Sequence, residues 1–433
     1  MSRRPPGPGA ARRWAGPGAP LRVAFLLYRG NPRCGGQGVY ARHLTRELVA
    51  LGHEVTVLAG RPYPELDPGV TLVRLPSLDL YRDGDPFRQP RWREIAGPVD
   101  LLELAAMRAG GFAEPLTFSL RARNALARRA GAFHLVHDDQ SLGTGLLGMQ
   151  QDGWPVLASI HHPVTIDRAL DLAHASSRHR RLALRRWYGF AAMQGRVARR
   201  LARVVTVSGA ARDDIVREHR VHPARIAVVP VGVDTTVFHP RPAVRRVPGR
   251  VMTTASADVP LKGLLPLLEA VAKARVERPE VHLVVVGRPR RDGPVGAAID
   301  RLGLAGAVRF VTGDPDEALA HRYAEAACAV VPSLYEGFSL PAIEAMACGT
   351  PLVATTGGAL PEVVGEDGVH ARLVPPGDPS ALCQAILRLL GDPGLARGLG
   401  RAGGDRVRGR YSWRATAAAT VVEYERLLDG PAC

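Results

Sequence analysis

The sequence predicts an α/β protein with two doubly wound parallel-sheet domains that face a cleft. The chain has 433 residues, more than one hydrophobic core usually supports. Short apolar runs alternate with helical patterns over most of its length, as in parallel sheets covered by helices. This alternation is interrupted at 225–250, where proline and glycine are frequent, and then starts again. Such an interruption is typical of a linker between domains.

The first alternating series begins with a strand, a glycine-rich loop, a helix and a second strand. LRVAFLLY at 21–28 predicts the strand, and VYARHLTRELVALG at 39–52 predicts a helix with apolar side chains near one face. Further buried strands are predicted within 133–138, 155–162 and 203–208, and an insertion with helices near 99–108 and 119–130 occupies 77–130.

The second series has the same character, with VHLVVVG, CAVVPS and PLVAT as buried strands between helices. We expect four segments along the chain: a disordered tail at 1–20, an N-terminal domain at 21–230, a C-terminal domain at 231–410 and a helix at 411–433. The last helix is expected to pack back on the N-terminal domain.

Composition narrows the function classes. Apolar residues make up 46% of the chain, with no run long enough for a membrane helix. The five cysteines include no C-x-x-C pair, which favours a reducing cytoplasm over a disulfide framework or zinc site. The net charge of +16 indicates anionic partners, with the arginine preference of a GC-rich genome as the alternative.

The most informative stretch is YEGFSLPAIEAMACGTPLVATTGG at 335–358, which places Glu336 and Glu344 eight positions apart. Glu336 follows a predicted strand, where α/β proteins bind ligands. Pro341 fits only the first turn of a helix, so Glu344 lies about one turn inside it. The N–H groups at this helix start favour an anion. A phosphate there would have a carboxylate on each side for a diol, which suits a nucleotide diphosphate sugar; two solvated surface glutamates are the alternative.

The residues 336–364, EGFSLPAIEAMACGTPLVATTGGALPEVV, closely resemble the E-x7-E region of the retaining glycosyltransferases of family 4. VVPVGVDTTVF at 228–238 resembles the interdomain linker of that family, and LKGLLPLLEAV at 261–271 its Lys-Gly segment. The resemblance covers about residues 21–425. It implies the GT-B fold of two Rossmann-like domains, with the acceptor on the N-terminal domain and the nucleotide sugar on the C-terminal one.

The resemblance also implies individual roles. Glu336 would bind hydroxyls of the donor sugar, Glu344 would bind the ribose, and Lys262 would neutralise the diphosphate, a preorganised charge that favours transfer. His161, in SIHHP, would be a third catalytic residue beside Lys262 and Glu336. The implied donor-binding set is Gly35, Gly36, Ser256, Lys262, Glu336, Gly337, Phe338, Ser339, Leu340 and Glu344.

One position departs from the family pattern. Members usually carry an arginine a few residues before the lysine, whereas this chain has Ser256, Ala257 and Asp258 there. Either Ser256 takes a weaker role, or another arginine such as Arg288 contacts the phosphate, or phosphate binding is weaker. The sequence leaves these three options open.

Two other stretches could have a binding function, but each also has a simpler structural explanation. Asp138 and Asp139, in HDDQ, could bind a divalent cation, but we expect acceptor-side or structural roles for them and no metal. The arginine-rich stretch 178–204 contains Trp187 and Tyr188. This stretch has three interpretations: a solvated helix face, a membrane-surface helix or a nucleic-acid site. The nucleic-acid site is the least expected.

Together with these observations, the resemblance implies a retaining, metal-independent hexosyltransferase of glycan biosynthesis that uses a UDP- or GDP-linked sugar and needs no cofactor. Its acceptor would be a small molecule, a glycan or a lipid-linked glycan, and no nucleic acid is expected. The expected location is cytoplasmic, with peripheral contact to the inner face of the membrane through 178–204 as an option. The alternatives are a nucleotide-sugar epimerase of the same fold and a non-catalytic, membrane-peripheral protein that binds sugar nucleotides.

Overall fold

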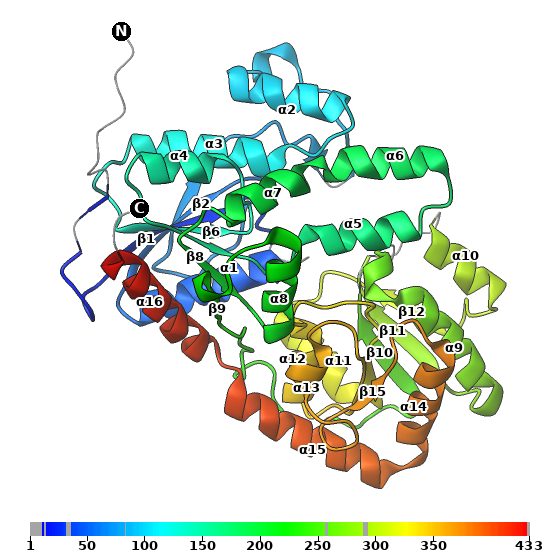
Figure 1. Ribbon diagram of the computed structural model, residues 1–433. Coiled ribbons are helices and arrows are strands. Elements are labelled where there is room, and N and C mark those ends of the chain that lie inside the picture. Colours follow the sequence, from blue (N-terminus) through cyan, green and yellow to red (C-terminus); the bar gives the residue numbers. More distant parts are fainter. Residues whose placement is uncertain are drawn as a thin grey trace. The chain divides into compact units, whose positions relative to one another are not determined.

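The computed structural model describes residues 11–12, 14–31, 36–82, 84–255, 259–288 and 293–430 (Figure 1). It contains two compact α/β units, as the sequence predicts. Unit 1 consists of Met1–Val207, Arg212–Val229 and Trp413–Cys433, and unit 2 of Ser208–Ala211 and Pro230–Ser412. The chain therefore returns to unit 1 for its last helix.

Unit 1 is built on a sheet of seven parallel strands in the order β3-β2-β1-β6-β7-β8-β9. The register is continuous, with Val23 of β1 beside Val55 of β2 and Leu135 of β6. The strands are β1 (Arg22–Leu27), β2 (Glu54–Ala59), β3 (Thr71–Arg74), β6 (Leu135–Asp139), β7 (Val156–Ser159), β8 (Arg203–Thr206) and β9 (Ile226–Val228). The order reverses between β1 and β6, which makes the carboxyl ends of these two strands the natural ligand-binding point of the sheet.

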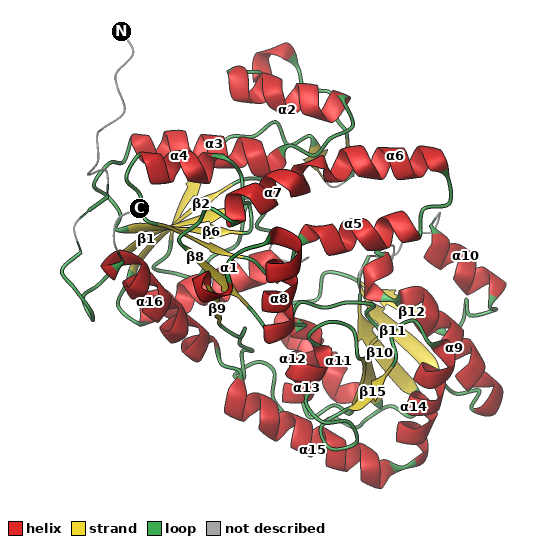
Figure 2. Ribbon diagram, in the orientation of Figure 1, coloured by secondary structure: helices red, strands yellow, loops and turns green. Residues whose placement is uncertain are grey.

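Helices cover both faces of this sheet (Figure 2). One face packs into the core with α3, α4 and α7, through side chains such as Phe118, Met149 and Val197. α1 and α16 contact each other and cover the other face. The helices of unit 1 are α1 (Gly36–Ala50), α2 (Pro98–Arg108), α3 (Glu114–Ala127), α4 (Gly145–Gln151), α5 (Val164–Ala173), α6 (Arg178–Trp187), α7 (Ala191–Ala198) and α16 (Trp413–Asp429); α8 (Gly209–Asp214) contains a boundary between the units.

Unit 2 repeats the plan with six parallel strands in the order β12-β11-β10-β13-β14-β15. The strands are β10 (Arg250–Thr254), β11 (His282–Val286), β12 (Val308–Val311), β13 (Cys328–Val331), β14 (Leu352–Thr355) and β15 (Arg372–Val374). Here the order reverses between β10 and β13. The carboxyl ends of β10 and β13 are therefore the expected ligand-binding point of unit 2.

The core of unit 2 lies between this sheet and the layer of α9, α10 and α14, where Leu267, Val295 and Ile386 are almost fully buried. The opposite face carries α11, α12 and α13 (Figure 2). The helices of unit 2 are α9 (Leu264–Glu277), α10 (Pro294–Arg301), α11 (Asp316–Glu325), α12 (Leu340–Ala347), α13 (Leu360–Val364), α14 (Pro379–Gly391) and α15 (Pro393–Arg410).

Three segments differ from the sequence expectations in detail. The stretch 225–250, predicted as a linker, begins with β9, which pairs with β8 at the edge of the unit 1 sheet. Its apolar residues Ile226 and Val228 supply the strand before the proline-rich part starts. The insertion contains a short hairpin of β4 (Tyr81–Arg82) and β5 (Asp85–Pro86) besides its helices. In the expected tail, Gly18 donates its N–H to Glu425 of α16 at 3.0 Å.

Candidate functional site

Lys262 and Glu336 meet where the strand order of unit 2 reverses. Lys262 follows β10 and Glu336 follows β13, so neighbouring strands deliver both side chains to one edge of the sheet. Lys262 Nζ donates to Glu336 Oε1 at 2.8 Å, and Ser333 Oγ donates to the same oxygen at 2.7 Å. Glu336 Oε2 accepts no hydrogen bond from the residues that the structure describes. One carboxylate oxygen is thus fixed, and the other is left for a ligand hydroxyl.

The backbone around this pair leaves space only for glycine at two positions. Gly263 has a φ of +63°, and a Cβ there would lie 1.9 Å from the carbonyl oxygen of Pro332. Gly358 has a φ of +61°, and its Cβ would lie 2.3 Å from the carbonyl oxygen of Glu336. Both glycines let loops approach the Glu336 segment closely. This close approach explains the Lys-Gly pair and the second glycine after β14.

The start of α12 supplies N–H groups beside Glu336. Ser339, the residue before the helix, has a φ of +98°, which is unusual for a side chain with a Cβ. Its Oγ is buried and has no hydrogen-bond partner among the described residues. The amides of Gly337, Phe338 and Ser339 likewise donate to no described group. Strain of this kind is commonly retained at ligand sites, and these groups together can hold an anion.

Phe338 anchors this loop from the other side. Its ring is buried and packs edge-on against Tyr411, with the ring centres 5.4 Å apart. The hydroxyl of Tyr411 donates to the carbonyl oxygen of Val363 at 3.2 Å. The loop between β13 and α12 is therefore held in place by packing, while its N–H groups remain available.

Glu344 lies one turn inside α12, as the sequence predicts, and its side chain is half-buried. Tyr323 of α11 donates its hydroxyl to Glu344 Oε2 at 3.4 Å, and Thr254 Oγ1 lies 3.0 Å from the same hydroxyl. Burial, followed by the nearby Asp316 carboxylate, raises the pKa of Glu344 to about 8. Glu344 Oε1 has no hydrogen-bond partner among the described residues. The carboxyl group is thus held from one side, with one oxygen left for a ligand.

Two residues of the expected donor set, Gly35 and Ser256, lie outside the described residues. Arg288, the alternative phosphate contact, follows β11 and is exposed. Gly36 is the first residue of α1, after β1 in unit 1. Ser256 and Arg288 therefore remain predicted alternatives to the arginine that other family members use to contact the phosphate.

In unit 1, His161 lies in the loop after β7 and pairs with Asp139 at the end of β6. His161 Nε2 and Asp139 Oδ1 are 2.7 Å apart, with the histidine 19% exposed and the aspartate fully buried. Asp139 Oδ2 is buried without a hydrogen-bond partner among the described residues. The edge of the Tyr40 ring packs against the His161 ring, with centres 4.7 Å apart. Asp139 and Tyr40 thus fix the orientation of the imidazole.

A buried polar network lies behind this pair. Ser159 Oγ contacts His137 Nε2 at 2.7 Å and the Tyr40 hydroxyl at 3.0 Å, and His137 Nδ1 contacts the Tyr424 hydroxyl at 2.6 Å. Burial lowers the pKa of His137 to about 3, so the ring is neutral at pH 7. The network connects α1, β6, β7 and α16, and it supports the loop that carries His161.

The environment of Asp138 indicates a structural role, because its carboxyl group is buried and hydrogen-bonded within the protein. Its carboxyl group accepts from Ser141 Oγ and, at 2.9 Å, from the backbone N–H of Leu142. Burial raises its pKa to about 7, although both hydrogen bonds oppose the shift. Among the residues that the structure describes, no group of three or more His, Cys, Asp or Glu side chains is arranged to hold a metal ion.

Several supporting side chains carry no sequence signal. Tyr323 and Thr254 hold Glu344, and Ser333 holds Glu336, but none belongs to a motif that points to its partner. The sequence predicts an acceptor-side or structural role for Asp139, but its pairing with His161 depends on β6 and β7 being neighbours. The arginine-rich stretch forms α6 and α7, and α6 exposes most of its residues, including Leu182 at 49%. No helix among the described residues is both long and apolar enough to cross a membrane.

Comparison with protein families gives two matches that together cover most of both units. Residues 34–237 match the family described as Glycosyltransferase Family 4. Residues 248–392 match the family described as Glycosyl transferases group 1. The second match contains Lys262, Glu336 and Glu344, and the first contains His161.

Curated proteins similar over nearly the whole chain include two kinds of enzyme. The MMP alpha-(1->4)-mannosyltransferase of Mycolicibacterium hassiacum is 52% identical over 409 residues, which cover 94% of this chain and 98% of that protein. The D-inositol 3-phosphate glycosyltransferase of Segniliparus rotundus is 31% identical and covers 95% of this chain and 90% of its own length.

Solved structures show the same fold. Sucrose-phosphate synthase from Thermosynechococcus elongatus has a TM-score of 0.71 and 26% identity, over 94% of this chain and 99% of that one. The glycosyltransferase WaaG, involved in lipopolysaccharide biosynthesis, has a TM-score of 0.68 at 16% identity, with 94% of this chain and all of the WaaG chain covered. The two parallel-sheet units therefore have the GT-B architecture.

Proposed function

The chain belongs to glycosyltransferase family 4, and we propose that it transfers a hexosyl group from a UDP- or GDP-linked sugar to an acceptor hydroxyl with retention of configuration. Glycosyltransferase activity follows from the family. The type of donor and the residues that bind it are our inference. The main support for this inference is a cluster at the carboxyl ends of β10 and β13. It contains Lys262, Glu336 and the Oγ of Ser339, which has no hydrogen-bond partner among the described residues.

The sugar we favour is mannose. The support is the 52% identity to a relative named as an alpha-(1->4)-mannosyltransferase. Because the name of that relative specifies an α-(1→4) linkage, a product with this linkage should be tested first. The acceptor would then be a mannose-containing glycan.

In the proposed donor complex, the start of α12 and Lys262 carry the charge of the departing diphosphate. Lys262 has three N–H donors, so it can keep its bond to Glu336 while it donates to a phosphate oxygen. Glu336 Oε2 would accept from hydroxyls of the sugar, and Glu344 from the ribose diol. Donors fixed in advance at the site of developing charge are the strongest general source of rate acceleration.

His161 is the proposed catalytic residue of unit 1, with Asp139 holding its ring. Retention by front-face attack, in which the departing phosphate takes the acceptor proton, agrees with the burial of Asp138 and Asp139. Both carboxyl groups are fully buried and hydrogen-bonded, so neither is suited to form a covalent bond with the sugar. No metal ion is assigned a role in this proposal.

The test combines donor binding with a product assay. Purified protein is titrated with UDP, GDP and their hexose derivatives, and product linkage and anomeric configuration are read by NMR with an α-(1→4)-linked mannooligosaccharide as acceptor. Glu344→Ala should weaken binding of the preferred nucleotide by tenfold or more while the melting temperature is kept. The matched control is Glu366→Ala, a change at an exposed position. If Glu344→Ala binds every nucleotide as the unaltered chain does, the donor assignment is wrong.

A further inference from the structure

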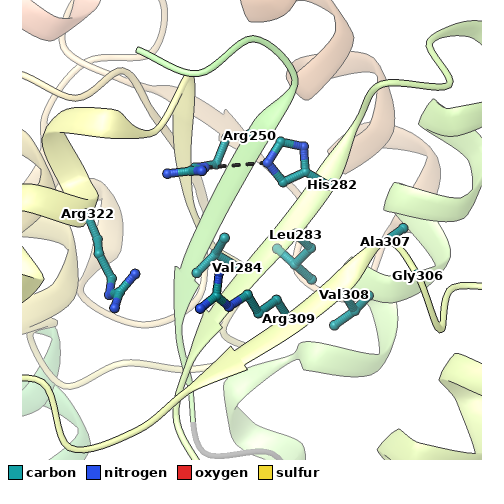
Figure 3. A pocket seen from close by; sticks show the side chains of 9 residues that line it. All are labelled: Arg250, His282, Leu283, Val284, Gly306, Ala307, Val308, Arg309 and Arg322. Carbon is teal, nitrogen blue, oxygen red and sulfur yellow. Dashed lines mark hydrogen bonds between the residues drawn. The ribbon is translucent and has the colours of Figure 1, made fainter. Parts of the chain in front are cut away.

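A cavity of about 220 Å³ lies at the amino ends of β10, β11 and β12 in unit 2 (Figure 3). Arg250 and His282 are the first residues of β10 and β11, and Gly306 and Ala307 directly precede β12. β10 has five residues, so the cavity lies roughly 13 Å along that strand from its carboxyl end. The cavity is therefore distinct from the proposed donor site, at the opposite edge of the same sheet.

The lining combines positive charge with an apolar floor. Three arginines and one histidine surround the cavity, while Leu283, Val284 and Val308 form its apolar part. The charged residues come from three strands and one helix (Figure 3): Arg250, His282, Arg309 and Arg322. Guanidinium groups bind phosphate through paired N–H donors.

The positive charge of the cavity is only partly balanced. Arg250 forms an ion pair with Glu325 at 2.6 Å, and Arg322 forms one with Asp314. Arg309 is exposed and has neither an ion pair nor a side-chain hydrogen bond to any described residue. Two carboxylates thus face three guanidinium groups, which leaves one positive charge for an anion.

His282 contributes a polar side chain beside Arg250. Its Nε2 accepts from Arg250 Nε at 3.4 Å, and its Nδ1 donates to the carbonyl oxygen of Glu280 at 3.1 Å. This pattern requires the tautomer with the proton on Nδ1. His282 therefore orients Arg250.

We propose that this cavity binds a small phosphate monoester, with the phosphate on Arg309 and the neighbouring guanidinium groups and the carbon body against the apolar floor. The cavity is larger than a phosphate group alone needs, which favours an attached organic part over a free inorganic ion. The proposal concerns a second site and does not depend on the identity of the donor sugar.

The first test uses a charged and a neutral probe of similar size. Glycerol 3-phosphate and glycerol are titrated calorimetrically into the full chain at constant ionic strength. Glycerol 3-phosphate should bind with saturation, and glycerol should not. Arg309→Gln should weaken this binding by about tenfold, because it removes the unbalanced charge, whereas Arg397→Gln should leave it unchanged. Arg397 is an exposed arginine of α15 outside the cavity.

A second variant places charge in the cavity without crowding it. A Cβ at Gly306 would meet no atom within 4 Å, so a side chain there is tolerated sterically. Gly306→Glu should abolish glycerol 3-phosphate binding, and the neutral, similarly shaped Gly306→Gln should retain more of it. Lys262→Ala should bind the probe as the unaltered chain does, because Lys262 belongs to the other edge of the sheet. Unchanged binding by Arg309→Gln and Gly306→Glu, or equal loss in Arg397→Gln, would overturn the proposal.

Discussion

Glu344 is the residue whose chemistry most depends on its surroundings. It is an acid on a buried helix, held by the Tyr323 hydroxyl, with a pKa raised to about 8 by burial and by Asp316. At neutral pH most of the protein therefore carries the protonated form. A protonated carboxyl group accepts fewer hydrogen bonds than a carboxylate, and a ribose diol offers two.

Donor affinity should therefore rise with pH from 6.5 to 8.5. The ionised fraction of Glu344 increases through its pKa of about 8, and below that value the affinity should fall by up to about tenfold per pH unit. Titration calorimetry with the preferred nucleoside diphosphate measures this. Glu344→Gln has no ionisable group at the position, so it gives the baseline for titration of the nucleotide itself. Parallel pH curves for the two proteins would contradict the assignment.

The residues proposed to contact the donor are easier to find in the sequence than those that support them. Glu336, Glu344 and Lys262 lie in motifs whose spacing reflects strand ends and a helix start, and the structure brings Lys262 and Glu336 together. Tyr323 is a tyrosine in an ordinary amphipathic helix, so its contact with Glu344 depends on how α11 and α12 pack. The spacing of residues within one helix does not predict a contact between side chains of two different helices.

At the scale of elements, α16 is the clearest example of long-range packing. Trp413 at its start stacks on His43 of α1, with ring centres 5.0 Å apart, and Glu423 pairs with Arg203 of β8 at 2.5 Å. Tyr424 reaches the buried His137 at the centre of the sheet. The helix thus completes the core of unit 1 and is part of the network behind His161.

The buried His137 should make its contribution to stability dependent on pH. The pKa of the ring is about 3 in the folded chain and about 6.5 when unfolded, so only the unfolded state takes up its proton between these values. The stability from neutral His137 is therefore lost as pH falls below 6.5. The advantage in unfolding free energy over His137→Gln should be about 2 kcal/mol smaller at pH 5 than at pH 7.

Urea unfolding of the unaltered chain and of His137→Gln at pH 5 and pH 7 checks this. The measured quantity is the difference in unfolding free energy between the two proteins at each pH. The difference is needed because burial raises the pKa of Glu114 and Asp138 to about 7, and both groups act in the opposite direction. A pH-independent difference would show that His137 titrates normally in the folded chain.

Element boundaries show where local pattern is sufficient and where it is not. Pro341 and the preceding strand placed the start of α12 within one residue, because proline is confined to the first turn. The sequence pattern places β9 in the linker, because a three-residue strand at the edge of a sheet is stabilised by pairing with its neighbour β8 and has little pattern of its own.

At the scale of the whole molecule, the two parallel sheets were predictable because each buried strand is a continuous apolar run and each crossover contains a helix. Apolar runs alone do not define the order of the strands, yet both sheets follow the doubly wound plan with one reversal each. The reversal in unit 2 lies between β10 and β13, the strands that Lys262 and Glu336 follow. The reversal in unit 1 lies between β1 and β6, whereas His161 and Asp139 lie at the ends of β7 and β6. Motif and fold predictions therefore point to the same place in unit 2.

The chain passes between its two units four times, because unit 2 contains Ser208–Ala211 as well as Pro230–Ser412. In the longer of these two segments it enters unit 2 at Pro230 and leaves after Ser412. Val233 and Ser412 form a β-bridge, so the entering and leaving segments run side by side within unit 2. One cut in the backbone therefore cannot release either unit.

This connectivity predicts an unusual response to a protease. A cleavage site inserted after Arg245, an exposed residue in a loop before β10, should give two fragments on a denaturing gel that elute as one species under native conditions. The helix α16 of the second fragment should stay in the core of the first, where Glu423 pairs with Arg203 and Tyr424 contacts His137. Separation of the two fragments of the cleaved full chain under native conditions would contradict this expectation. The terminal helix thus makes the molecule resistant to a single proteolytic nick.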